Sequence, residues 1–91
     1  MALTDENLVS ERQHLDGVQR RYKVGEYGLS LINGPMLHAY PFAWEAAVFG
    51  PDGSLDYSTP LTSDVEVFDT EEEANAFIEK AFAWFREQAA A

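Results

Sequence analysis

The C-terminal part of the chain repeats its apolar positions with the period of an α-helix. Between residues 71 and 88, apolar side chains recur every three or four positions and form one broad stripe. Its members are Ala74, Phe77, Ile78, Ala81, Phe82, Trp84 and Phe85. Thr70, followed three residues later by Glu73, fits the capping-box pattern of a helix start. The pattern predicts a helix from Glu71 to Gln88, with an aromatic face that needs a flat surface to cover.

Upstream of this helix, apolar and polar residues alternate with a period of two, which is typical of half-buried strands. Residues 18–24 alternate in this way, although Arg20 falls on the apolar side. Gly25-Glu26 fits a two-residue turn that leads into a second strand over residues 27–32. One long strand with a bulge near Gly25 fits equally well. The remaining predicted strands cover residues 42–49, 55–58 and 65–68, and the first two of these would form a hairpin across a Gly-Pro-Asp-Gly turn.

The first residues give a weaker pattern. Residues 4–16 are predicted to form a short helix, because Thr4 suits its start and Gly17 its end, but a loose arm is the alternative. We therefore expect an α+β fold, in which an antiparallel sheet of three to five strands is covered on one face by the C-terminal amphipathic helix. Residues 1–17 would form an N-terminal arm or short helix, and residues 18–88 a single α+β domain.

Charge restricts the partners that this chain can bind. The net charge is −10 over 91 residues, and residues 46–91 carry ten acids but only two bases. The one basic cluster in the sequence, at Arg20, Arg21 and Lys23, is too small to hold a phosphate backbone against this field. We expect no direct binding of nucleic acid. No apolar run approaches the length of a membrane span, and the polar N-terminus does not resemble a signal peptide, so we expect a cytoplasmic protein that does not bind membranes.

The residues that could carry catalysis or bind a metal are few. There is no cysteine, and the two histidines, His14 and His38, lack the neighbouring ligands that a zinc site needs. Motifs for phosphate-binding loops, dinucleotide sites and serine nucleophiles are also missing. We therefore expect no catalytic residue, no metal and no cofactor, and a protein that is not an enzyme.

Six carboxylates gather within ten residues, over the predicted last strand and the start of the helix. They are Asp64, Glu66, Asp69, Glu71, Glu72 and Glu73. The last three stabilise the positive end of the helix, which accounts for them without any binding function. The first three have no such role, although edge strands often carry charge that prevents aggregation. The run therefore represents either solubility and capping or an electrostatic binding face.

A second candidate is the apolar segment that lies between Pro35 and Pro41. Met36, Leu37 and Tyr40 are more apolar than a solvated loop requires. They could cover one end of the sheet and complete a small core, as a domain of this size needs. They could instead be exposed anchors for a partner, since Met and Tyr are enriched at the centres of protein interfaces.

These observations lead to the hypothesis of an acidic inhibitor that occupies a basic surface of a larger protein. A nucleic-acid mimic, such as a phage-encoded anti-CRISPR-like protein, is one form, and an immunity protein or antitoxin facing a basic toxin is another. The alternative is an accessory protein that forms a homodimer or larger oligomer through its sheet, with the acids serving solubility. The residues predicted to bind the partner are Asp64, Glu66, Asp69, Glu71, Glu72, Met36, Leu37 and Tyr40.

Overall fold

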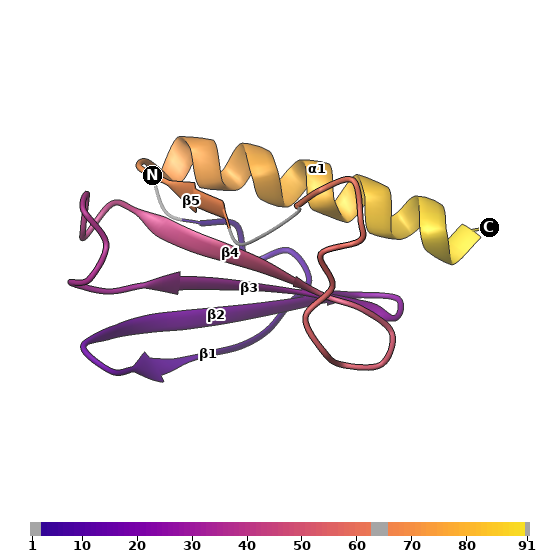
Figure 1. Ribbon diagram of the computed structural model, residues 1–91, viewed down its shortest axis with the longest axis horizontal. Helices are drawn as coiled ribbons and strands as arrows, with labels where there is room; N and C mark the ends of the chain where they lie inside the picture. Colours follow the sequence, from indigo (N-terminus) through magenta and orange to yellow (C-terminus); the bar gives the residue numbers. More distant parts are fainter. Residues whose placement is uncertain (1–2, 63–65, 91) are drawn as a thin grey trace.

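The computed structural model describes residues 3–62 and 66–90, and these residues form one antiparallel sheet and one helix. The five strands lie in the sheet in the order in which they occur along the chain, and the helix α1 lies across one face (Figure 1). The elements are β1 (Leu8–His14), β2 (Gly17–Val24), β3 (Tyr27–Asn33), β4 (Trp44–Phe49), β5 (Glu66–Phe68) and α1 (Glu71–Ala90). The predicted α+β fold, with one C-terminal helix on an antiparallel sheet, is confirmed.

The core lies between α1 and the face of the sheet that this helix covers. From α1 it takes the predicted stripe, with Trp84 half-buried and the other members buried. The sheet contributes alternate residues of the central strands, which are Tyr22, Leu29, Leu31, Ala46 and Val48. Aromatic rings join the two layers, since Tyr22 lies 5.6 Å from Phe82 and Tyr27 stacks on Phe85 at 5.3 Å between ring centroids. The aromatic face of α1 therefore packs against one face of the sheet.

The start of α1 has the predicted cap. The backbone N–H of Glu73 donates to the Thr70 hydroxyl oxygen at 3.1 Å, and that hydroxyl donates to the Glu73 carboxylate at 3.2 Å. The cap satisfies one of the backbone donors that a helix start leaves without a partner. The helix ends at Ala90, two residues beyond the predicted end.

The turn between β2 and β3 decides between the two interpretations of residues 18–32. Val24 pairs with Tyr27, so Gly25 and Glu26 form a two-residue turn, and Gly25 has a φ of 60°. The hairpin is therefore confirmed, and a single bulged strand is excluded. Glycine at this position adopts the positive φ without the steric cost that other residues incur.

The prediction of a short helix over residues 4–16 was wrong, because residues 8–14 form the edge strand β1. This strand pairs with β2 through a tight turn at Leu15 and Asp16, and Leu15 has a φ of 55°. Gly17 does not end a helix. A Cβ atom at this position would lie 1.7 Å from the carbonyl oxygen of Asn33, so the close approach of β2 to β3 requires glycine here.

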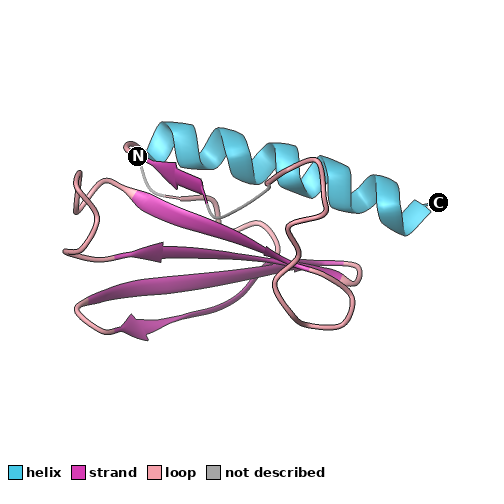
Figure 2. Cartoon of the chain, in the orientation of Figure 1, coloured by secondary structure: helices cyan, strands magenta, loops and turns pink. Residues whose placement is uncertain are grey.

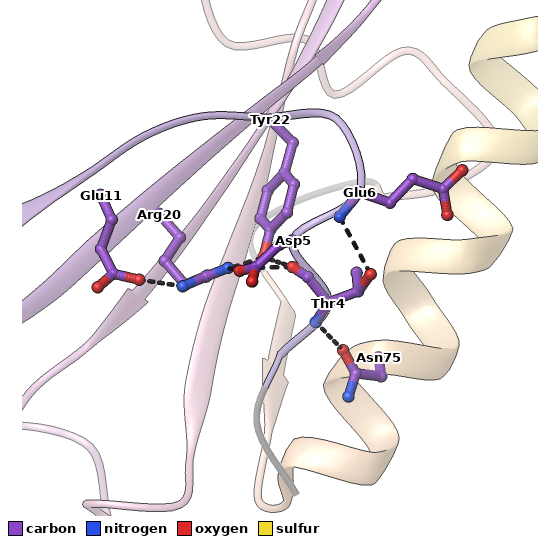
Figure 3. Close-up of polar contacts among 7 residues, drawn as sticks. All are labelled: Thr4, Asp5, Glu6, Glu11, Arg20, Tyr22 and Asn75. Carbon is purple, nitrogen blue, oxygen red and sulfur yellow. Dashed lines mark hydrogen bonds and ion pairs between the residues drawn. The ribbon is translucent and has the colours of Figure 1, made fainter.

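The residues that precede β1, 3–7, contact both the sheet and α1. Leu3 is buried in the core, and the backbone N–H of Thr4 donates to the side-chain oxygen of Asn75 on α1 at 2.9 Å. The Tyr22 hydroxyl donates to the carbonyl of Thr4 at 2.8 Å (Figure 3). The first residues of the chain therefore contribute to the core and contact both of its layers.

Arg20 occupies the apolar side of β2 because it has a set of polar partners there. Its guanidinium donates to the Tyr22 hydroxyl at 2.9 Å and to the Thr4 carbonyl at 3.1 Å, and it forms ion pairs with Asp5 and Glu11 (Figure 3). Burial alone would lower the pKa of Arg20, but its hydrogen bonds to Tyr22 and Asp5 raise it overall. Arg20 thus remains charged and links β1, β2 and the N-terminal residues.

The predicted strand over residues 55–58 was also wrong. Phe49 and Leu55 form an isolated bridge, and the chain then leaves the sheet. The side chain of Asp52 accepts the backbone N–H of Ser54 at 3.0 Å, and Asp56 accepts that of Ser58 at 2.9 Å. These local bonds turn the backbone at the positions where a strand would have paired.

Candidate functional site

The structure brings the two predicted partner-binding segments to one end of the sheet. Phe68, the last residue of β5, pairs with Trp44, the first residue of β4. The start of α1 therefore lies at the end of the sheet where the loop between β3 and β4, residues 34–43, also lies (Figures 1 and 2). We call this surface the acidic end, and it consists of Glu66, Asp69, Glu71, Glu72, Met36, Tyr40 and Phe42.

The carboxylates of the acidic end lie on β5, on the first turn of α1 and, for Asp69, in the connection between these two elements. Glu66, Asp69 and Glu72 are exposed, and Glu71 is half-buried. Among the described residues, none of these four carboxylates forms an ion pair. Asp64, which was predicted to join them, lies outside the described residues. The surface therefore presents negative charge that is not neutralised by a described basic residue of the same chain.

The apolar residues of the loop between Pro35 and Pro41 differ in their exposure to solvent. Leu37 is 9% exposed and lies outside the main core cluster, whereas Met36 is 59% exposed and Tyr40 also lies at the surface. Leu37 is therefore placed as a packing residue, and Met36 and Tyr40 remain candidates for contact with a partner.

Phe42 belongs to this surface, although its position in the sequence predicts a strand residue. It is 61% exposed and precedes β4, which begins at Trp44. The side-chain amide of Asn33 donates to the carbonyl of Pro41 at 2.9 Å and holds the loop beside the end of β3. Pro41 could have indicated that the strand begins later than residue 42, because proline lacks the backbone N–H that strand pairing uses.

The basic residues that are adjacent in the sequence do not lie together in the fold. Alternation along β2 places Arg20 on the face that α1 covers, and Arg21 and Lys23 on the opposite, open face. Arg12 of β1 pairs with Gln19 and lies on that open face as well. The predicted cluster of three cations is therefore split, and a different set of three forms in space.

The described residues contain no cluster of metal-ligating side chains. No three histidines or carboxylates of the described ranges come close enough to hold a metal ion. Within these ranges, α1 is too polar to cross a membrane. The chain matches no known protein family, no curated protein and no solved structure. Its function is therefore argued from the chemistry of its own surfaces.

Proposed function

We propose that this chain is a non-enzymatic binding domain that occupies a basic surface of a larger protein through its acidic end. The observation that carries the proposal is that the segments bearing exposed carboxylates and exposed apolar side chains lie at one end of the fold (Figure 1). Stable protein interfaces combine an apolar centre with a polar rim. Met36 and Phe42 supply large apolar side chains for the centre, and Asp69 and Glu72 supply charge for the rim.

An inhibitor of a nucleic-acid-binding protein is the form that fits this surface best. Carboxylates presented by β5 and α1 match the sign of a phosphate backbone, and the net charge of −10 attracts a basic groove over a distance. A protein that occupies such a groove excludes the nucleic acid and acts as its mimic. An anti-CRISPR-like inhibitor is one form that such a mimic could take. An immunity protein or antitoxin that covers a basic toxin would use the same surface.

The experiment is an affinity capture from the native host lysate at low salt, with three versions of the protein. The first is the parent. The second carries Glu66→Gln with Asp69→Asn in the acidic end. The third carries Glu79→Gln with Glu87→Gln on the exposed side of α1 and has the same change in net charge. We expect the parent and the third version to retain one basic partner that moderate salt releases, and the second to lose it.

The rate of association with the captured partner then provides the quantitative test. Electrostatic steering predicts that Glu66→Gln with Asp69→Asn slows association and reduces its salt dependence, and that Glu79→Gln with Glu87→Gln changes both much less. Equal rates for the two charge variants would show that only total charge matters. A partner bound equally well by the parent and the acidic-end variant would contradict the proposal.

Self-association through the sheet is the second candidate, and the edge strand β1 weighs against it. This strand has a register irregularity between Leu8 and Ser10, and it carries Glu11 and Arg12. Bulges and charges are the features by which edge strands avoid pairing with another copy. We therefore expect a monomer in light-scattering measurements, and a stable dimer at micromolar concentration would favour the accessory-subunit function instead.

A further inference from the structure

The open face of the sheet has a basic hollow at the end opposite the acidic end. Arg12, Arg21 and Lys23 line it on the side of β1 and β2, and Phe49 and the turn at residues 50–53 line it on the other side. Its volume is about 390 Å³, which lies in the range of small-ligand sites. Half of the six basic residues of an acidic chain therefore surround one concave site.

Two of the three cations are held in position by neighbouring side chains. The Arg12 Nε donates to the side-chain oxygen of Gln19 at 3.0 Å, and the Gln19 amide donates to the Ser30 hydroxyl at 3.0 Å. Gln19 and Ser30 are both buried, so this chain of hydrogen bonds anchors Arg12 across three strands. The Arg21 guanidinium lies 4.6 Å from the centre of the Phe49 ring, in a cation–π contact.

The charge of these groups is not neutralised within the described part of the chain. None of the three cations forms an ion pair there, whereas Arg20 on the other face forms two. Of the described acidic residues, Glu26, in the turn after β2, is the only one that lines the hollow, since Asp52 of the turn at residues 50–53 does not. Three like charges placed together repel one another, and a bound anion would relieve that repulsion.

We propose that this hollow binds the phosphate group of a small anionic molecule. Two guanidinium groups and one ammonium group match a dianion, and guanidinium forks bind phosphate oxygens in pairs. A single carboxylate would leave part of this positive charge without a partner. Phe49 and Val9 add apolar surface for the organic part of the ligand. The site is separate from the acidic end, and this inference does not depend on the proposed function.

The test is a titration followed by two-dimensional NMR of the backbone amides and the arginine Nε groups. Phenyl phosphate, inorganic phosphate and benzoate are the three probes, at constant ionic strength. We expect phenyl phosphate to give saturable shifts at Ser10, Gly28 and the Arg12 and Arg21 Nε groups. Inorganic phosphate should bind the same groups more weakly, and benzoate should bind weakest. Weaker binding of the free ion would show that the organic group of phenyl phosphate adds to the binding.

Matched variants assign the binding to the hollow. Arg21→Gln should weaken phenyl phosphate binding at least about tenfold, since a charge-assisted hydrogen bond contributes of that order. Lys23→Gln removes an exposed cation without a packing role and should also weaken binding, so it serves if Arg21→Gln unfolds. Arg86→Gln, on exposed α1 surface, should bind like the parent.

Three results would overturn the inference. The first is the lack of any saturable shift with phenyl phosphate up to about 10 mM, beyond the millimolar range expected of weak anion sites. The second is benzoate binding as tight as phenyl phosphate binding, which would assign recognition to the ring. The third is saturable binding of a poly-glutamate peptide without a response to phenyl phosphate, which would assign the open face to an acidic protein partner.

Discussion

The hydroxyl of Tyr22 donates a hydrogen bond of 2.8 Å to the backbone carbonyl of Thr4, and this contact holds the N-terminal residues against β2 (Figure 3). Tyr22 is only 2% exposed, and its ring lies against Phe82 of the helix. One side chain therefore joins the sheet, the helix and the first residues of the chain. The hydrogen bond and the ionisation of this phenol can be tested separately.

Replacing Tyr22 with phenylalanine keeps the ring and removes two hydrogen bonds, the one that the hydroxyl donates to Thr4 and the one that it accepts from Arg20. We expect Tyr22→Phe to lower the free energy of unfolding by about 1 kcal/mol, because the carbonyl of Thr4 keeps its bond from Arg20. Urea denaturation measures this change. Tyr57→Phe is the control, since Tyr57 lies at the surface and should leave the midpoint unchanged. A Tyr22→Phe midpoint equal to that of the parent would show that the hydrogen bonds of the Tyr22 hydroxyl contribute nothing to stability.

The same phenol should make stability fall at alkaline pH. Burial raises the pKa of Tyr22 above its ordinary value of 10.0, and the hydrogen bond from Arg20 opposes this rise only in part. The folded state therefore favours the neutral phenol. Its contribution to stability is complete below pH 10 and is lost as the pH rises through the raised pKa of the folded state.

We expect the parent to lose stability relative to Tyr22→Phe above pH 10, and Tyr57→Phe to follow the parent. Thermal unfolding of the three proteins between neutral pH and pH 11, a range of about four pH units, measures the difference. The other titrating groups are shared, so their effects cancel in the comparison. Parallel curves for the parent and Tyr22→Phe would contradict the raised pKa.

Gly17 should tolerate no side chain. Because a Cβ atom there would lie 1.7 Å from the Asn33 oxygen, Gly17→Ala must separate β2 from β3. We expect a loss of more than about 3 kcal/mol in the free energy of unfolding, which is exceptional for one methyl group. Gly28→Ala is the control, since its new Cβ would meet its nearest neighbour at an ordinary 3.5 Å. Similar stabilities of the two variants would disprove this close approach.

Met36 and Leu37 are adjacent in sequence and should respond oppositely to truncation. Leu37→Ala should cost about 2–5 kcal/mol, because it removes most of a buried side chain. Met36→Ala should stay within about 0.5 kcal/mol of the parent, as expected for an exposed residue. Chemical denaturation of the two variants measures both values. A large loss for Met36→Ala would give Met36 a structural role and remove it from the proposed interface.

The C-terminal helix was predictable because all of its determinants are local. The stripe from Ala74 to Phe85 and the cap at Thr70 act within a few residues of each other, and both occur as predicted. The turn at Gly25 was one of two interpretations that the sequence left open, and the pairing of Val24 with Tyr27 decided between them. Its glycine is the residue type that a positive φ favours, so the sequence carries the signal where the structure uses it.

The edge strand β1 was not predictable because its determinants lie elsewhere in the chain. Leu15 adopts a positive φ without the glycine or asparagine that would have indicated a turn. The reason for Gly17 is the carbonyl of Asn33, which only the folded sheet brings near. Because residues 4–16 were predicted to form a helix, Arg12 was not expected to lie on the open face of the sheet. The basic hollow therefore could not be seen from the sequence.

The order of the strands in the sheet has a consequence for how quickly the chain folds. Strands β1 and β2, and then β2 and β3, pair across two-residue turns, so these two hairpins can close without bringing distant segments together. The contact between Thr4 and Asn75 spans 71 positions and must wait until the sheet and α1 have met. Folding should thus proceed as local zipping followed by closure of the chain ends, and weakening that closure should chiefly accelerate unfolding.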